Sequence, residues 1–220
     1  MLREALAYPF AGERRGRRIL GTLVMVASIP LLVTAPIYAG YVVRLLRDAA
    51  YGDTAPPRNA DIGGLFVEGL TAISLVVVYA AVPLSPFVVA SLPFIDVSFG
   101  TAGEVALAAV SLVLAYVLPA VLASYAADAS VVGGLAGRRI WRALTSRDYV
   151  VAWIPAAVIG GGVAVSVLIL GSLGVITTIV FGTPVVFYGT TVAGYLVARG
   201  FAASVTLARR PVVRNTGPAG

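Results

Sequence analysis

Three carboxylic acids are the side chains whose type and position could support chemistry, and they are Asp61, Glu68 and Asp128. With a bound cation, such a set would suit a lipid-modifying membrane enzyme. The sequence, however, has no histidine or cysteine, and it shows no phosphate-binding glycine loop, no HExxH helix and no nucleophile with a visible base. Acids of this kind more often cap helices or pair with arginine. We therefore expect no enzyme activity, no cofactor and no bound metal.

The basic residues are the second chemical feature. All 16 of them are arginine, the net charge is +6, and they gather beside the ends of apolar runs. Arg138, Arg139 and Arg142 form one such group. Because this placement suits anionic lipid head groups, we expect membrane lipids rather than nucleic acid as partners. A membrane-protein partner or a second copy of the chain is open as well, since small residues such as those at 160–162 allow helices to approach closely.

Composition determines which elements carry these residues. Apolar residues make up 59% and charged residues 12% of the chain, and the mean hydropathy is +0.95. A helix needs about 20 residues to cross the hydrocarbon core of a bilayer. Uncharged runs of that size or longer cover residues 19–43, 69–95, 105–127 and 149–198, and the last has room for two spans. We predict an all-α, polytopic transmembrane helical bundle, with about five to six membrane segments plus two interfacial amphipathic helices.

The predicted bounds follow from these runs. Residues 1–205 form one integral-membrane domain, and residues 206–220 a flexible cytoplasmic tail. Within the domain, 47–69 is a surface connector, while 1–18 and 130–148 are helices that lie in the membrane interface. The membrane segments are residues 19–46, 70–99, 104–127, 149–171 and 174–199.

Apolar stripes predict the two interfacial helices. In the first, Leu2, Leu6 and Phe10 are spaced four residues apart. In the second, arginines lie opposite an apolar stripe, and tryptophan nearby favours the head-group layer. That stripe consists of Val132, Ala136, Ile140 and Leu144, with Arg138 and Arg142 opposite and Trp141 and Trp153 beside the junction.

Arginine placement also predicts the topology. The positive-inside rule puts the arginine-rich flanks in the cytoplasm, so both termini are expected there, in a protein of the cell membrane. Five simple crossings would put 130–148 outside, so one segment must enter and leave on the same side. The favoured segment is 70–99 and the alternative is 19–46. Prolines interrupt both: Pro83, Pro86 and Pro93 in the first, Pro30 and Pro36 in the second.

Several stretches together resemble a known family. They are ALAYPF near the start, AGYVVRLLRDAAYGDTAPPRNADIGGLFVEGL in the middle, AYVLPAVLASYA at 115–126, and TSRDYVVAW. In this order, they are similar to the uncharacterised archaeal integral-membrane family catalogued as domain of unknown function 4013, over residues 2 to about 200. The matching signature residues are Gly40, Tyr41, Arg44, Asp61, Leu65, Phe66, Glu68 and Gly69. No activity is established for that family, so the resemblance implies a membrane fold and leaves function open.

Two functions fit this pattern. The leading hypothesis is a non-enzymatic component that organises lipids or a partner at the cytoplasmic face through its basic surface helices, because arginines lie at the borders of the predicted spans and no acid or arginine lies in mid-span. The alternative is a small-solute permease or permease subunit. Its polar path would run along Thr177, Thr178, Thr183, Tyr188, Thr190 and Thr191.

Overall fold

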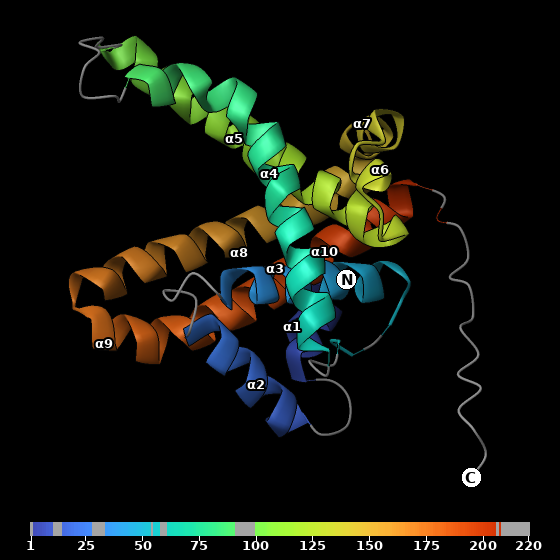
Figure 1. Ribbon diagram of the computed structural model, residues 1–220, viewed down its shortest axis with the longest axis vertical. Coiled ribbons are helices and arrows are strands. Elements are labelled where there is room, and N and C mark those ends of the chain that lie inside the picture. Colours follow the sequence, from blue (N-terminus) through green and yellow to red (C-terminus); the bar gives the residue numbers. More distant parts are fainter. Residues whose placement is uncertain are drawn as a thin grey trace.

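The computed structural model describes residues 2–10, 15–27, 34–53, 55–57, 61–90, 100–205 and 207, and within these ranges it contains helices and turns but no strand. The all-α fold is therefore confirmed. In chain order (Figure 1) the elements are α1 (Leu2–Ala7), the 3-10 turn η1 (Tyr8–Phe10), α2 (Arg15–Ala27), α3 (Thr34–Ala50), α4 (Ile62–Ala90), α5 (Gly100–Asp128), α6 (Val131–Gly134), α7 (Gly137–Leu144), α8 (Arg147–Ser172), α9 (Val175–Thr177), the π-helical turn η3 (Thr178–Gly182) and α10 (Thr183–Ser204).

Two long hairpins dominate the architecture. The first is α4 with α5, and the second is α8 with α9, η3 and α10. Figure 1 shows them leaving a shared base in different directions, with α6 and α7 on the side away from their tips. In that base α3 packs along both α4 and α10. The second hairpin turns at Gly174, whose φ of 115° is a left-handed conformation that glycine adopts without strain.

Four helical stretches are long and apolar enough to cross a membrane, among the described residues: Ile62–Val89, Gly100–Asp128, Arg147–Ser172 and Val175–Ser204. Only a small share of their residues is buried inside the protein. Large apolar side chains such as Val82, Leu112 and Leu168 are instead exposed along the hairpins. Apolar surface on this scale needs an apolar surrounding. We therefore conclude that the protein is embedded in a membrane through these helices.

The predicted segment 19–46 has a different structure. It is divided between α2 and α3, which have 13 and 17 residues and are not among the four candidate spans. Pro36 lies in the first turn of α3, where a missing N–H removes no helical hydrogen bond. Pro30 lies outside the described residues. The described chain thus has four candidate spans, against the predicted five to six.

The favoured re-entrant segment also differs in its described part. Helix α4 continues through Pro83 and Pro86 to Ala90, so the helix is not broken at these two prolines as the sequence suggested. Pro93 lies outside the described residues. Because α3 continues to Ala50 and α4 already begins at Ile62, the connector is shorter than the predicted 47–69.

The segments expected at the interface pack partly onto the bundle. Tyr8 contacts Tyr195 of α10 with ring centroids 4.5 Å apart, whereas Leu2 and Leu6 are exposed. Residues 130–148 contain α6, α7 and the start of α8 rather than one helix, and Ser130 and Ser146 cap the N-termini of α6 and α8. Ile140 is buried, but Val132 is exposed, so the predicted stripe does not form a single face.

Candidate functional site

A cluster of arginines and carboxylates joins α3 to α4 in the base. Arg44 donates from Nε to Glu68 Oε1 at 3.2 Å and from Nη2 to Asp61 Oδ2 at 3.0 Å. Arg47 donates from Nη2 to Glu68 Oε2 at 3.4 Å. Glu68 therefore lies between two guanidinium groups and uses both of its oxygens. We call Arg44, Arg47, Asp61 and Glu68 the charge cluster.

Helical spacing brings these side chains together. Arg44 and Arg47 are three residues apart on α3, and therefore lie on neighbouring positions of one helix face. Asp61 precedes α4, and its Oδ1 accepts the Gly64 N–H at 2.9 Å, as an N-terminal capping residue does. This bond, followed by the Arg44 hydrogen bond, holds the pKa of Asp61 below its usual value of 3.8. Asp61 thus begins α4 and ties it to α3.

Two glycines explain why the helices can come so close. A Cβ on Gly69 would lie 1.6 Å from the Pro36 carbonyl oxygen, and one on Gly40 would lie 1.9 Å from the Leu65 carbonyl oxygen. No side chain fits at either position without moving the backbone. Tyr41, next to Gly40, is fully buried in the core. The signature residues Gly40 and Gly69 therefore set the approach of α3 to α4.

The end of α5 completes the cluster, which sequence reasoning did not anticipate. Arg47 Nε donates to the Ala126 carbonyl at 2.8 Å, and the Tyr51 hydroxyl donates to the Ala127 carbonyl at 3.0 Å. These carbonyls belong to the last turn of α5, where intrahelical donors run out. The Tyr125 hydroxyl in turn donates to the Glu68 carbonyl at 3.2 Å. The sequence signal was the stretch at 115–126, whose Tyr125 reaches α4.

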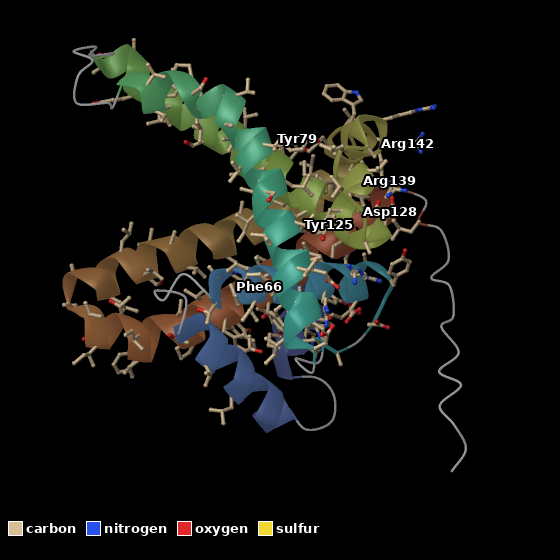
Figure 2. The ribbon with its side chains drawn as sticks, in the orientation of Figure 1. Phe66, Tyr79, Tyr125, Asp128, Arg139 and Arg142 are labelled. Carbon is tan, nitrogen blue, oxygen red and sulfur yellow. The ribbon has the colours of Figure 1, made fainter. Side chains whose placement is uncertain are left out.

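Phe66 does not belong to this cluster. Its side chain is 38% exposed on α4. Figure 2 also shows it well away from the second ion pair, which Asp128 and Arg139 form. The structure thus brings most signature residues together and leaves Phe66 on the outer surface.

The three arginines of α7 have two different environments. Arg139 Nη1 lies 2.6 Å from Asp128 Oδ2, which ties α7 to the end of α5; Figure 2 shows the two side by side. Arg138 and Arg142 are exposed, and within the described part of the chain neither side chain forms an ion pair. Trp141, between them, is 69% exposed. We call Arg138, Trp141 and Arg142 the α7 surface.

The three acids considered for chemistry do not form one site. Asp61 and Glu68 share Arg44, whereas Asp128 is paired with Arg139. The interpretation that they cap helices or pair with arginine is confirmed. Among the residues that the structure describes, no group of three or more histidine, cysteine, aspartate or glutamate side chains is placed to hold a metal ion.

Three threonine hydroxyls of the predicted polar path bond to the backbone of their own helix, and the Tyr188 hydroxyl donates to the Leu6 carbonyl of α1 at 3.2 Å. Thr178 donates to the Gly174 carbonyl at 2.9 Å, and Thr191 donates to the Phe187 carbonyl at 2.7 Å. Thr190 bonds to the Val186 carbonyl at 2.6 Å and also to the Tyr38 hydroxyl. These hydroxyls serve the helix and its neighbour, as is usual in membrane helices.

Comparison with known proteins gives one match. No curated protein and no solved structure matches the chain. The model of the family described as protein of unknown function (DUF4013) matches residues 23–175, which include the charge cluster and the α7 surface. The match covers more than half of the sequence and confirms the resemblance. The chain belongs to this DUF4013 family, for which no function is established.

Proposed function

We propose that this protein is a non-enzymatic, multi-pass component of the cell membrane that binds anionic lipid head groups at the cytoplasmic face through the α7 surface. The observation that carries the proposal is the exposure of Arg138, Trp141 and Arg142 on a helix whose Ile140 and Ala143 are buried. Helix α7 is therefore fixed to the bundle on one side and presents cations and an indole ring on the other.

The chemistry of these side chains supports a lipid partner. A guanidinium group donates two parallel hydrogen bonds to a phosphate, and it stays charged at any physiological pH. Tryptophan favours the layer where head groups meet hydrocarbon. Val132 and Leu135 are also exposed close by in the sequence, which adds apolar surface beside the arginines. Because each arginine near an anionic surface contributes about 1 kcal/mol, two free arginines give a marked preference for anionic lipid.

The span arrangement supports the cytoplasmic side. Four crossings by α4, α5, α8 and α10 return the chain to the side on which α4 begins. The start of α4, the connection that contains α7 and the end of α10 then share one side. Arginine is present at each of these places, and the positive-inside rule assigns arginine-rich flanks to the cytoplasm.

The experiment measures lipid preference at the protein surface. The full chain is reconstituted in bilayers that contain a trace of spin-labelled phosphatidylglycerol or phosphatidylcholine. Electron paramagnetic resonance then gives the association constant of the anionic lipid relative to the zwitterionic one. We expect a preference for phosphatidylglycerol that weakens with salt, because exposed charges are screened.

Matched variants locate this preference. The double variant Arg138→Gln/Arg142→Gln is expected to lose most of it, whereas Arg138→Lys/Arg142→Lys keeps the charge and retains it. An unchanged preference in the glutamine variant overturns the proposal. If the glutamine variant also loses a protein that co-purifies with the wild type, the α7 surface binds a protein partner instead. Saturable uptake of a small solute that survives both substitutions would instead favour the permease.

A further inference from the structure

A cavity of about 580 Å³ lies between the two hairpins. Helices α3, α5, α8 and α10 all contribute to its lining, and it is partly open to the outside. This volume lies within the range of small-molecule binding sites, about 300–1,000 Å³. Nothing in the charge cluster or the α7 surface requires such a space.

The lining is almost entirely hydrocarbon. Its polar atoms come chiefly from Trp153 and Thr190, and both are already bonded within the protein. The Trp153 Nε1–H donates to the Ala115 carbonyl at 3.0 Å, and the Thr190 hydroxyl donates to the Val186 carbonyl at 2.6 Å. A polar solute would lose its water and gain no partner there, which is costly. The cavity therefore suits an apolar occupant.

Small residues create the space. Gly160 and Gly161 of α8 and Gly194 of α10 are part of the lining. A Cβ built on Gly160 or Gly161 would meet no atom within 4 Å, apart from neighbours in its own helix. An empty space of this kind forfeits the dispersion contacts that a packed interior provides. A filled cavity is thus more stable than an empty one.

The surrounding surface identifies what fills it. Leu112 lines the cavity and is itself 63% exposed, and Val158 and Leu168 are exposed on the same α8 helix. These side chains belong to the candidate spans, whose outer faces contact the bilayer interior. The cavity is therefore continuous with the lipid-facing surface, and hydrocarbon chains are the molecules available at its opening.

We propose that the cavity binds one hydrocarbon chain of a membrane lipid, which enters sideways from the bilayer between α5 and α8. The site is separate from the α7 surface, so the inference goes beyond the proposed function and does not depend on it. The bound chain would occupy space that the helices leave open and would help to hold the two hairpins together.

The test counts retained lipid. The full chain is purified in mild detergent from bilayers of defined phosphatidylcholine, and native mass spectrometry measures the lipid bound per chain. Gly161→Leu fills the cavity. Gly162→Leu is its control, because Gly162 is the next residue, its Cβ would also meet nothing within 4 Å, and it does not line the cavity. We expect wild type and Gly162→Leu to retain lipid, and Gly161→Leu to retain severalfold less.

A second measurement places the chain in the cavity. The protein has two tryptophans, so in Trp141→Phe the emission comes from Trp153, which lines the site. Phosphatidylcholine brominated along its acyl chain is expected to quench this emission more strongly in the Gly162→Leu background than in the Gly161→Leu background. Ala164→Phe serves as a second filling variant if Gly161→Leu does not fold.

Three results would overturn the inference. One is equal lipid retention in Gly161→Leu and Gly162→Leu. Another is stronger quenching of Trp153 by acrylamide than by brominated chains, which would indicate a water-filled cavity. The third is a shift from dimer to monomer in Gly161→Leu alone, which would assign the cavity to a second copy of the chain. Gly161 lies outside the α7 surface, so Gly161→Leu is expected to keep the preference for anionic lipid in the spin-label assay, and failure of either proposal is recognised separately.

Discussion

Arg44 and Glu68 join α3 to α4 through a hydrogen bond of 3.2 Å between the Arg44 Nε and Glu68 Oε1. The side chains are 18% and 23% exposed, so water reaches each of them only in part. Arg47 contacts the other oxygen of Glu68 and also the end of α5. The Glu68 carboxylate thus links α4 to α3, Arg47 links both to α5, and removal of the carboxylate would leave two guanidinium groups without their shared acceptor.

The first prediction concerns Glu68→Gln. We expect the free energy of unfolding to fall by about 1.5–3 kcal/mol, because a charged hydrogen-bond partner is lost while both arginines remain. The measurement is thermal or denaturant unfolding in a bilayer mimetic. Glu104→Gln is the control, since Glu104 is exposed at the start of α5. In Arg44→Gln/Glu68→Gln the loss should be smaller than the sum of the single losses. Equal effects of Glu68→Gln and Glu104→Gln would contradict the structural role of the charge cluster.

The second prediction concerns helix approach. Gly69→Ala would place a Cβ 1.6 Å from the Pro36 carbonyl oxygen, so α3 and α4 must separate. We expect the free energy of unfolding to fall by about 1–3 kcal/mol, the usual cost of an extra methyl group in a packed contact. Gly63→Ala is matched, because its Cβ meets only the Asp61 Oδ1 at 3.9 Å. Unfolding midpoints that agree between the two variants would show that the contact can relax.

The third prediction concerns acid. The pKa of Asp61 is held below 3.8, first by the Gly64 N–H and then by Arg44. A carboxylate with a depressed pKa in the folded state stabilises the protein above its unfolded pKa, and this contribution disappears as pH falls through the folded pKa. Asp61→Asn should therefore unfold more easily than wild type at neutral pH, and the difference should shrink below pH 3.8. A difference that persists in acid would exclude ionisation as its cause.

The sequence predicts the helices well because their cause is local. Uncharged runs at 105–127 and 149–198 correspond to α5 and to α8 through α10, since a chain in hydrocarbon must satisfy its own backbone. The same constraint explains why α4 continues through Pro83 and Pro86. In lipid, breaking the helix would expose further backbone groups, which costs more than the bond that each proline removes.

The partners of the charged residues depend on distant contacts, which spacing does not reveal. Pairing of acids with arginine was expected in general, but Arg44 meets Glu68 only because Gly40 and Gly69 let α3 approach α4. Likewise, Arg138, Arg139 and Arg142 look equivalent in the sequence. The turn after α5 places Asp128 beside Arg139 alone, which separates a structural arginine from two exposed ones.

The last prediction distinguishes the two topologies by cysteine labelling, because the chain has no cysteine of its own. Suitable single-cysteine positions are the exposed residues Ile62, Thr101, Gly137 and Leu173. With α4, α5, α8 and α10 as the spans, Thr101→Cys and Leu173→Cys should react with an impermeant maleimide in intact cells. Ile62→Cys and Gly137→Cys should react only after permeabilisation. The topology favoured from the sequence has a crossing by residues 19–46 and a re-entrant segment at 70–99. It predicts the same labelling at the other three positions but places Ile62 outside the cell. Labelling of Ile62→Cys in intact cells would therefore reject the four-span arrangement. It would also reject the inference that the start of α4 lies on the same side of the membrane as α7.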